Sequence, residues 1–189
     1  MVQEHRPLRG IGNAVLVLLA LELAVLAARL GVQLLPGLPW LPLSWHLIDR
    51  LDSAGNTLTL VTGIVFVMWF GRARINAEAS GWRQRRARAW TFWGWIVPLA
   101  NLFVPFQLMG DIWRASLPED RRRETAWLPG LWWTCLLAGC VTRSGAHPRA
   151  ARYMPYLYPT MWWWSLVLLG AAAALLIVIV GRVSDSPIG

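Results

Sequence analysis

Long apolar stretches constrain this chain more than any other feature of its sequence. Residues 11–35 and 160–180 are predominantly apolar, and about 20 apolar residues in a helix cross the hydrocarbon core of a bilayer. Three further apolar stretches lie between them, at residues 57–77, 90–113 and 127–141. Because a backbone in lipid must satisfy its own hydrogen bonds, such stretches are expected to be helical. The sequence therefore predicts an all-α, polytopic membrane helical bundle with four to five hydrophobic segments.

The composition supports a membrane protein and excludes several soluble classes. Hydrophobic residues make up 56% of the chain, charged residues make up 15%, and the mean hydropathy is +0.43. These values exclude a disordered chain, and they are more apolar and less charged than those of an ordinary soluble domain. They also exclude a soluble nucleic-acid-binding domain, although the net charge is +8. We expect one integral membrane domain over residues 1–189, with a C-terminal helix at 160–181 and no nucleic-acid partner.

The N-terminal stretch is expected to remain in the protein as an anchor helix. Arg6 and Arg9 precede it, as in a signal peptide, but its apolar core is too long and it lacks a clear small-x-small cleavage site. We therefore expect a multi-pass protein of the cell membrane with a cytoplasmic N-terminus. Glu22 lies near the middle of this stretch, and Arg29 follows two turns later on the same helix face.

A connector rich in proline and tryptophan, residues 36–56, follows the anchor. Three prolines within residues 36–42 are incompatible with a helix interior. The second helix is then expected at residues 57–77, with Ser80-Gly81 as its stop signal. A basic loop at residues 83–88 comes next, and we expect it to contact anionic lipid headgroups.

The third stretch contains Pro98, Asn101 and Pro105 at its centre. A proline removes a backbone donor, so the segment is broken there and forms either a kinked spanning helix or two half-helices that re-enter. Five spans with the N-terminus inside would place eleven arginines inside and six outside. Re-entry of the third stretch changes these numbers to thirteen and four. Since arginine accumulates on the cytoplasmic side, the count favours re-entry.

Polar residues within apolar stretches are the candidate functional residues, because they are costly in a membrane. They are Glu22, Asn76, Asn101, Gln107 and Asp111. Gln107 and Asp111 are four residues apart, as are Arg72 and Asn76, so each pair shares a helix face. A bundle that turned both pairs inward would form a polar cluster in which Arg72 or Arg74 neutralises Asp111. The alternative is structural, with the Asp–Arg pair locking two helices together.

Sequence patterns for catalysis and metal binding are absent. The chain has no G-x-S-x-G, H-E-x-x-H or glycine-rich phosphate loop. Cys135 and Cys140 are five residues apart and do not share a helix face, and the three histidines are scattered. We expect no metal site and no cofactor, and we retain Asp111 and Glu22 as candidate catalytic acids.

Several runs of residues resemble the signature of a known family. The run Val67 to Ala77 resembles F-x-x-W-x-x-R-A-R-x-N-A, and Trp93 to Leu102 matches W-x-W-x-x-P-x-A-N-L. Residues 105–107 and 111–116 match P-Y-Q and D/E-I-W-R-A-S. The chain is therefore similar, over about residues 51–139, to the family called domain of unknown function 4328. The resemblance implies a multi-pass protein of the actinobacterial cell membrane and implies no activity.

The polar residues singled out above fall on motif positions of this family. The chain departs from the family pattern at residues 85–90, where members often have a Gly-Pro-rich stretch ending in S-P-G-W. The candidate ligand-binding residues combine the motif positions with nearby tryptophans in this tryptophan-rich chain. They are Arg72, Arg74, Asn76, Trp93, Trp95, Asn101, Gln107 and Trp113.

Three functions remain open. The favoured one is a membrane module that binds a lipid or a partner, which includes a second copy of the chain. Gly170 and Ala174 form a small-xxx-small pair that would permit such a helix contact. The second is an intramembrane, terpene-cyclase-like enzyme that acts on an isoprenoid or lipid by acid catalysis, with tryptophans lining an apolar pocket. The third is a small transporter or channel, which the broken helix would suit.

Overall fold

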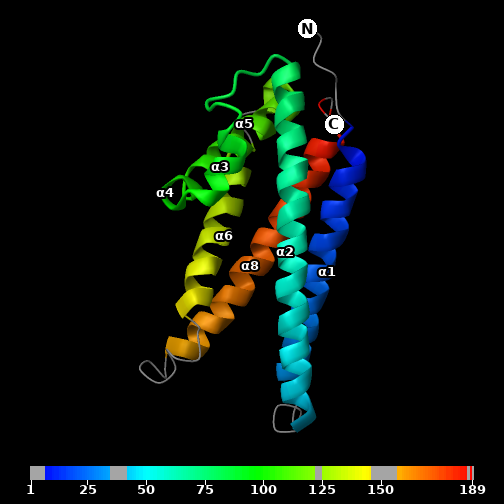
Figure 1. Ribbon diagram of the computed structural model, residues 1–189, viewed down its shortest axis with the longest axis vertical. Helices are drawn as coiled ribbons and strands as arrows, with labels where there is room; N and C mark the ends of the chain where they lie inside the picture. Colours follow the sequence, from blue (N-terminus) through cyan, green and yellow to red (C-terminus); the bar gives the residue numbers. More distant parts are fainter. Residues whose placement is uncertain (1–6, 35–41, 122–124, 146–156, 187, 189) are drawn as a thin grey trace.

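The computed structural model describes residues 7–34, 42–121, 125–145, 157–186 and 188, and its regular elements there are all helical (Figure 1). The longest helices are α1 (Arg9–Leu34), α2 (Pro42–Ala79) and α8 (Leu157–Ser184). All three are long and apolar enough to cross a membrane. A fourth, α6 (Leu128–Gly145), runs antiparallel to α8. The predicted all-α membrane bundle is confirmed.

The helices pack as two pairs joined along one side. Helix α1 packs against α2, α6 packs against α8, and α1 also packs against α8. The backbones of α2 and α6 stay apart, so these two helices frame a gap that side chains only partly fill. The common core includes Trp69, Ile112 and Ile179, at the end of the bundle where α2 meets α5 and α8.

The third apolar stretch is broken into three helices, as its prolines predict. They are α3 (Trp90–Ile96), α4 (Pro98–Asn101) and α5 (Val104–Ser116). The chain bends by 105° between α3 and the helices that follow it. Pro98 begins α4 and Pro105 occupies the first turn of α5. A proline is tolerated at a helix start because the N–H it lacks has no intrahelical partner there.

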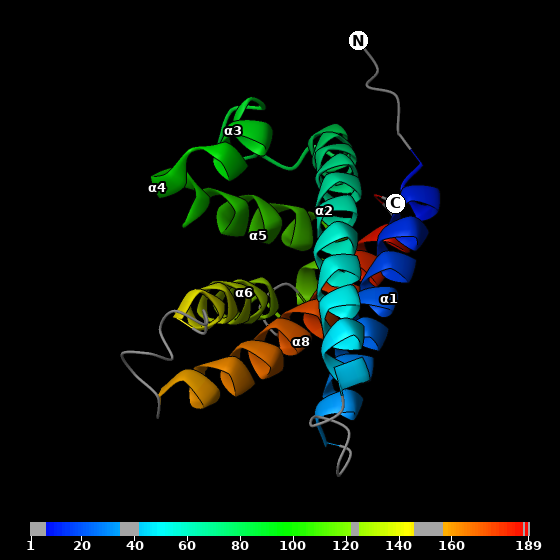
Figure 2. The ribbon, with the colours of Figure 1, turned by 60° about the horizontal axis from the view of Figure 1, so that its bottom comes forward.

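Both ends of this broken segment lie at the same end of the bundle. Thr91 in α3 accepts a hydrogen bond from Arg74, near the C-terminal end of α2. Ser116, at the end of α5, lines a second pocket together with Arg182 of α8. Figure 2 shows the three short helices on the side of α2 away from α1. The segment therefore turns back as a hairpin toward the end of the bundle at which it begins, the arrangement that the arginine count favours.

The surface of this hairpin that faces away from the bundle is apolar. Ile96, Leu99 and Phe103 are 59%, 78% and 62% exposed, respectively. In water such a patch would be unfavourable, whereas in a bilayer it faces lipid tails. The hairpin is anchored from inside by Trp133 of α6, whose indole N–H donates to the Leu102 carbonyl at 2.8 Å.

The predicted connector at residues 36–56 is wrong for residues 42–56, which form the start of α2. Pro42 is the first residue of the helix, a position that suits proline. This part of the helix carries polar residues, among them His46, Asp49 and Asp52, so it lacks the apolar run on which the prediction relied. Residues 36–41 lie outside the described part of the chain.

Glycines mark one helix end and one close helix contact. Gly81 has a positive φ of 84° just after α2, which confirms the predicted stop. A methyl group on Gly139 of α6 would lie 2.8 Å from the Leu169 side chain of α8, so glycine permits this contact. Of the predicted small-residue pair, Gly170 faces Leu26 of α1, but Ala174 is exposed. That pair therefore does not form a contact within the chain.

Candidate functional site

The motif residue Arg74 anchors the loop that connects α2 to α3. Its side chain is only 2% exposed. Its guanidinium group donates to the carbonyl oxygens of Arg86 and Ala87, to the Thr91 hydroxyl at 2.6 Å and to the Glu78 carboxylate at 3.2 Å. A planar fork with five N–H donors suits several fixed acceptors at once. Arg74 therefore holds the loop and the first turn of α3 in place.

Asp111 in α5 binds the same loop, which Arg74 holds from α2. Asp111 is only 1% exposed, and its carboxylate pairs with Arg85 and with Arg114, each at 3.3 Å. It also accepts the Arg85 backbone N–H at 3.2 Å. The predicted pairing of Asp111 with Arg72 or Arg74 is wrong, because the loop supplies Arg85 and occupies Arg74. Asp111 thereby binds the loop to α5.

The remaining polar positions of the motifs make structural hydrogen bonds. Gln107 accepts from Arg86 at 3.1 Å, and Asn76 donates to the Ile188 carbonyl at 2.8 Å. The buried Trp113 donates to the Thr125 carbonyl at 3.0 Å. The structure therefore brings Arg74, Gln107 and Asp111 together through the loop. We call Arg74, Glu78, residues 85–91, Gln107 and Asp111 the loop network.

Three other predicted residues lie apart from the loop network. Arg72 is half-buried on α2, and Asn101 is half-buried as the last residue of α4. Trp93 is 56% exposed and lies on the outer side of the hairpin. In the described residues no group of His, Cys, Asp and Glu side chains is arranged to hold a metal ion.

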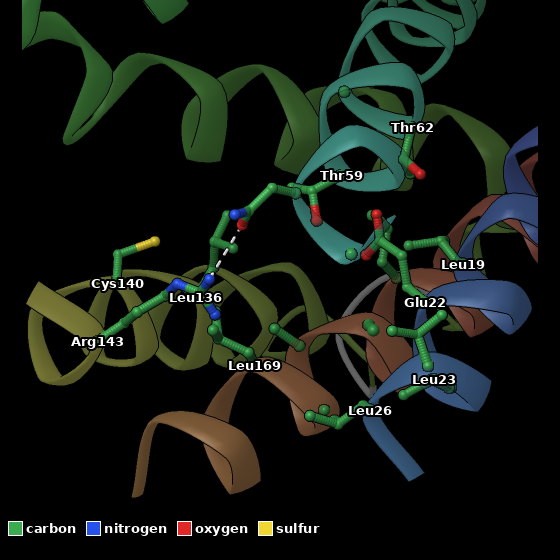
Figure 3. Close-up of a pocket in the computed structure, with 18 of the residues that line it drawn as sticks. Leu19, Glu22, Leu23, Leu26, Thr59, Thr62, Leu136, Cys140, Arg143 and Leu169 are labelled. Carbon is green, nitrogen blue, oxygen red and sulfur yellow. Dashed lines mark hydrogen bonds between the residues drawn. The ribbon is translucent and has the colours of Figure 1, made fainter. Parts of the chain in front are cut away.

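A cavity of about 410 Å³ lies elsewhere, between α1, α2, α6 and α8 (Figure 3). Leucine is the most frequent residue in its lining, and all four helices contribute leucine side chains to it. The volume falls within the range of roughly 300–1,000 Å³ that is typical of small-molecule sites. This cavity is the candidate binding site.

Aromatic rings close the cavity at the end nearest the hairpin. Phe66 meets Trp95 edge-on, with ring centroids 5.7 Å apart, and lies 6.1 Å from Trp132. Trp95 also contacts Phe70 and Trp133. These rings make one end of the cavity rigid and apolar, and we call Phe66, Trp95 and Trp132 the aromatic roof.

Glu22 brings a carboxyl group to the middle of this apolar space. Figure 3 shows it directed into the cavity, with the hydroxyl groups of Thr59 and Thr62 on either side. Its Oε1 atom is buried and accepts no hydrogen bond of ordinary geometry within the described residues. Thr62 donates its own proton to the Leu58 carbonyl at 2.9 Å. The cavity therefore contains a buried carboxyl oxygen, Glu22 Oε1, that accepts no well-formed hydrogen bond from the described residues although two hydroxyl groups lie beside it.

Charged residues lie at the end of the cavity opposite the aromatic roof. Arg29 pairs with Asp52 at 2.8 Å, and its guanidinium carbon lies 5.4 Å from the centre of the Trp162 ring. Arg143 of α6 donates to the Asn56 side-chain oxygen of α2 at 3.1 Å, the dashed line in Figure 3. This hydrogen bond crosses the gap between α2 and α6.

The cavity opens sideways through that gap. The residues that line it from α2 and α6 and are exposed are Asn56, Thr59, Gly63, Cys140 and Arg143. They face each other where the two helix backbones separate. In a bilayer, a side opening of this kind faces the lipid tails below the headgroup layer.

Most of the cavity was not predicted from the sequence; of the predicted site residues, Glu22 and Trp95 line it. A signal was nevertheless present in α2. Small and polar residues recur three or four positions apart along one face of an otherwise apolar helix, a helical period. They are Asp52, Gly55, Asn56, Thr59, Thr62 and Gly63.

The fold and the site together define a polytopic helical membrane protein with an intramembrane cavity and a hairpin that turns back. A family model described as domain of unknown function (DUF4328) matches residues 51–152, more than half of the chain. The chain belongs to this family. No curated protein and no solved structure matches it. The matched region begins in α2 and ends after α6, so α1 with Glu22 lies outside it.

Proposed function

We propose that this protein is a membrane module that binds a lipid-like molecule in the cavity between α1, α2, α6 and α8. The observation that carries the proposal is the cavity itself, which has about 410 Å³ of space, apolar walls and a side opening between α2 and α6. An opening at that depth admits molecules that are already dissolved in the bilayer. The ligand therefore has an apolar chain.

Selectivity for such a ligand must come from shape and polar contacts. A chain gains little by moving from lipid tails into an apolar cavity, since both surroundings are equally apolar. The aromatic roof supplies shape, and Glu22 with the Arg29–Asp52 pair supplies polar contacts. An amphiphile with one small polar group fits this arrangement better than a pure hydrocarbon does.

The proposal includes an orientation in the cell membrane. Among the described residues, ten arginines lie at the end of the bundle that holds the loop network, and cytoplasmic loops are enriched in basic residues. They are Arg9, Arg72, Arg74, Arg83, Arg85, Arg86, Arg88, Arg114, Arg121 and Arg182. We assign this end, and with it the N-terminus, to the cytoplasm. Arg83 and its neighbours in the 83–88 loop are exposed or half-exposed there and would contact anionic headgroups.

One observation favours a second function, acid catalysis on the bound molecule. Glu22 places a carboxyl group in the same cavity as the aromatic roof, and aromatic faces stabilise cationic intermediates. Asp111 is not part of that function, because it lies in the loop network and is bound to two arginines. An enzyme of this kind would release an altered lipid, and Glu22→Gln would abolish that product.

The test uses the full chain extracted in native lipid discs, with mass spectrometry of the retained lipids. The critical variant is Gly63→Phe, which narrows the cavity at a glycine with open space around it. The matched control is Gly71→Phe, because Gly71 is also on α2 and open but does not line the cavity. We expect enrichment of one lipid class in the wild type and the control, and its loss in Gly63→Phe. Lipid of bulk composition in all three proteins would overturn the proposal.

A further inference from the structure

The polar atoms within the cavity differ in whether they can still donate a proton. Glu22 Oε1 is buried and accepts no hydrogen bond of ordinary geometry from the part of the chain that the structure describes. The neighbouring Thr62 has committed its hydroxyl proton to the Leu58 carbonyl, so it presents only lone pairs to the cavity. Thr59 is the remaining hydroxyl beside the carboxyl group. Glu22 is therefore the acceptor in the middle of the cavity, while the buried donors without a partner among the described lining residues, Arg29 Nε and Trp95 Nε1, lie toward its two ends.

We propose that the ligand is a single-chain lipid alcohol whose hydroxyl group donates a hydrogen bond to Glu22. The inference rests on the proposed binding function and specifies the chemistry of its ligand. A buried acceptor without a partner is costly, and an occupant with an O–H group removes that cost. The hydroxyl oxygen can in turn accept from Thr59.

Alternative polar groups fit this position less well. A carboxylate or phosphate would repel Glu22, and an ether or ester has no proton to donate. An ammonium group could donate and would be attracted to an ionised Glu22, but removing it from water costs more than removing an alcohol. A single ion pair in an apolar cavity repays that cost only when further hydrogen bonds satisfy both charged groups. The cavity volume of about 410 Å³ also suits one chain and not the two chains of a phospholipid.

The position of Glu22 sets the direction of the chain. Thr62 is four residues from Phe66 on α2, so one helical turn separates the carboxyl group from the aromatic roof. Arg29 and Asp52 neutralise each other at the opposite end. The apolar chain therefore extends from Glu22 beneath the aromatic roof.

Cys140 provides a native reporter of occupancy. It is exposed, lines the cavity at its side opening, and becomes the sole thiol of the chain in a Cys135→Ala background. The protein is first delipidated and then placed in lipid discs. The experiment measures the rate at which maleimide alkylates Cys140 in the presence of each of four probes. The probes are dodecanol, dodecyl methyl ether, dodecylammonium and dodecanoate, which share one chain and differ in the polar group.

We expect dodecanol to protect Cys140 at roughly tenfold lower concentration than the ether, as expected for a hydrogen bond to a buried carboxyl oxygen that otherwise accepts none of ordinary geometry. In Glu22→Leu this preference should disappear, while both probes still protect. Glu22→Gln keeps an acceptor oxygen and should retain part of the preference. Thermal unfolding of each variant checks that the fold is intact.

The outcomes separate this inference from the proposed function. If no probe protects Cys140, the binding function itself is wrong. If the ether equals or exceeds dodecanol, or if the preference survives in Glu22→Leu, the cavity binds lipid but the assignment of the hydroxyl to Glu22 is wrong. If dodecylammonium or dodecanoate protects best, the ligand is not an alcohol.

Discussion

The loop network and the cavity lie in the same bundle, but the acidic residue that each contains, Asp111 and Glu22, has different surroundings. In the loop network, Arg74 and Asp111 are buried and each has several partners. In the cavity, Glu22 Oε1 is buried and has no hydrogen-bond partner within the described residues. Fully satisfied polar networks rigidify a fold, whereas an unsatisfied group raises the question of a missing ligand. The comparison separates residues that hold the fold from residues available for binding.

The loop network and the cavity also draw on different parts of the sequence. The loop network lies within the matched family region, residues 51–152. Arg74, Gln107 and Asp111 are motif residues, whereas the loop residues 85–90 that they hold depart from the family pattern. The cavity takes Glu22 and Arg29 from α1, which lies outside that region. The motif positions thus describe how the hairpin is fastened, and α1 completes the cavity.

Arg74→Leu should cause the largest loss of stability among the variants of these two regions. The substitution removes a positive charge that pairs with the Glu78 carboxylate. It also removes the N–H donors for the carbonyl oxygens of two loop residues. Breaking a buried ion pair costs about 3 kcal/mol or more. We expect a large fall in folded yield and in unfolding temperature, measured by size exclusion and differential scanning fluorimetry. Arg83→Leu is the control, because Arg83 is exposed in the same loop; equal losses in both variants would contradict the anchoring role.

Asp111→Asn should have an intermediate effect. The amide keeps an oxygen for the Arg85 backbone N–H but loses the charge that pairs with Arg85 and Arg114. Since Arg85 is 55% exposed, solvent weakens that pair, and we expect a loss of about 1–2 kcal/mol in unfolding free energy. Lipid retention by the folded protein should remain that of the wild type. Selective loss of the bound lipid without loss of stability would instead place Asp111 in the binding function.

Much of the fold could be predicted because membrane helices are local in sequence. The apolar stretches located α1, α6 and α8, and the prolines located the break between α3 and α5. The start of α2 was missed, since residues 42–56 are polar and helical at once. Helices were located by the regular spacing of apolar residues. The polar start of α2 lacks such a pattern, so spacing alone could not identify it as part of the helix.

The site was harder to predict because it depends on tertiary placement. The partner of Asp111 is Arg85, 26 residues away in an irregular loop, and no helix period predicts that contact. The cavity arises because α2 and α6 diverge while both pack on other helices. Glu22 was recognisable as a costly polar residue, but its neighbours Thr59 and Thr62 follow only from the packing of α1 on α2.

Arg143→Ala should have the smallest effect on stability and a specific effect on the opening. The hydrogen bond from Arg143 to Asn56 crosses the gap between α2 and α6 and lies at an exposed position. Such a bond contributes roughly 1 kcal/mol or less, so the unfolding temperature should change little. Because the bond restrains the side opening of the cavity, Cys140 should react with maleimide several-fold faster in Arg143→Ala. Arg50→Ala, which changes an exposed arginine of α2 that does not line the cavity, should leave the rate unchanged. An unchanged rate in Arg143→Ala would mean that the opening is set by the helix backbones alone.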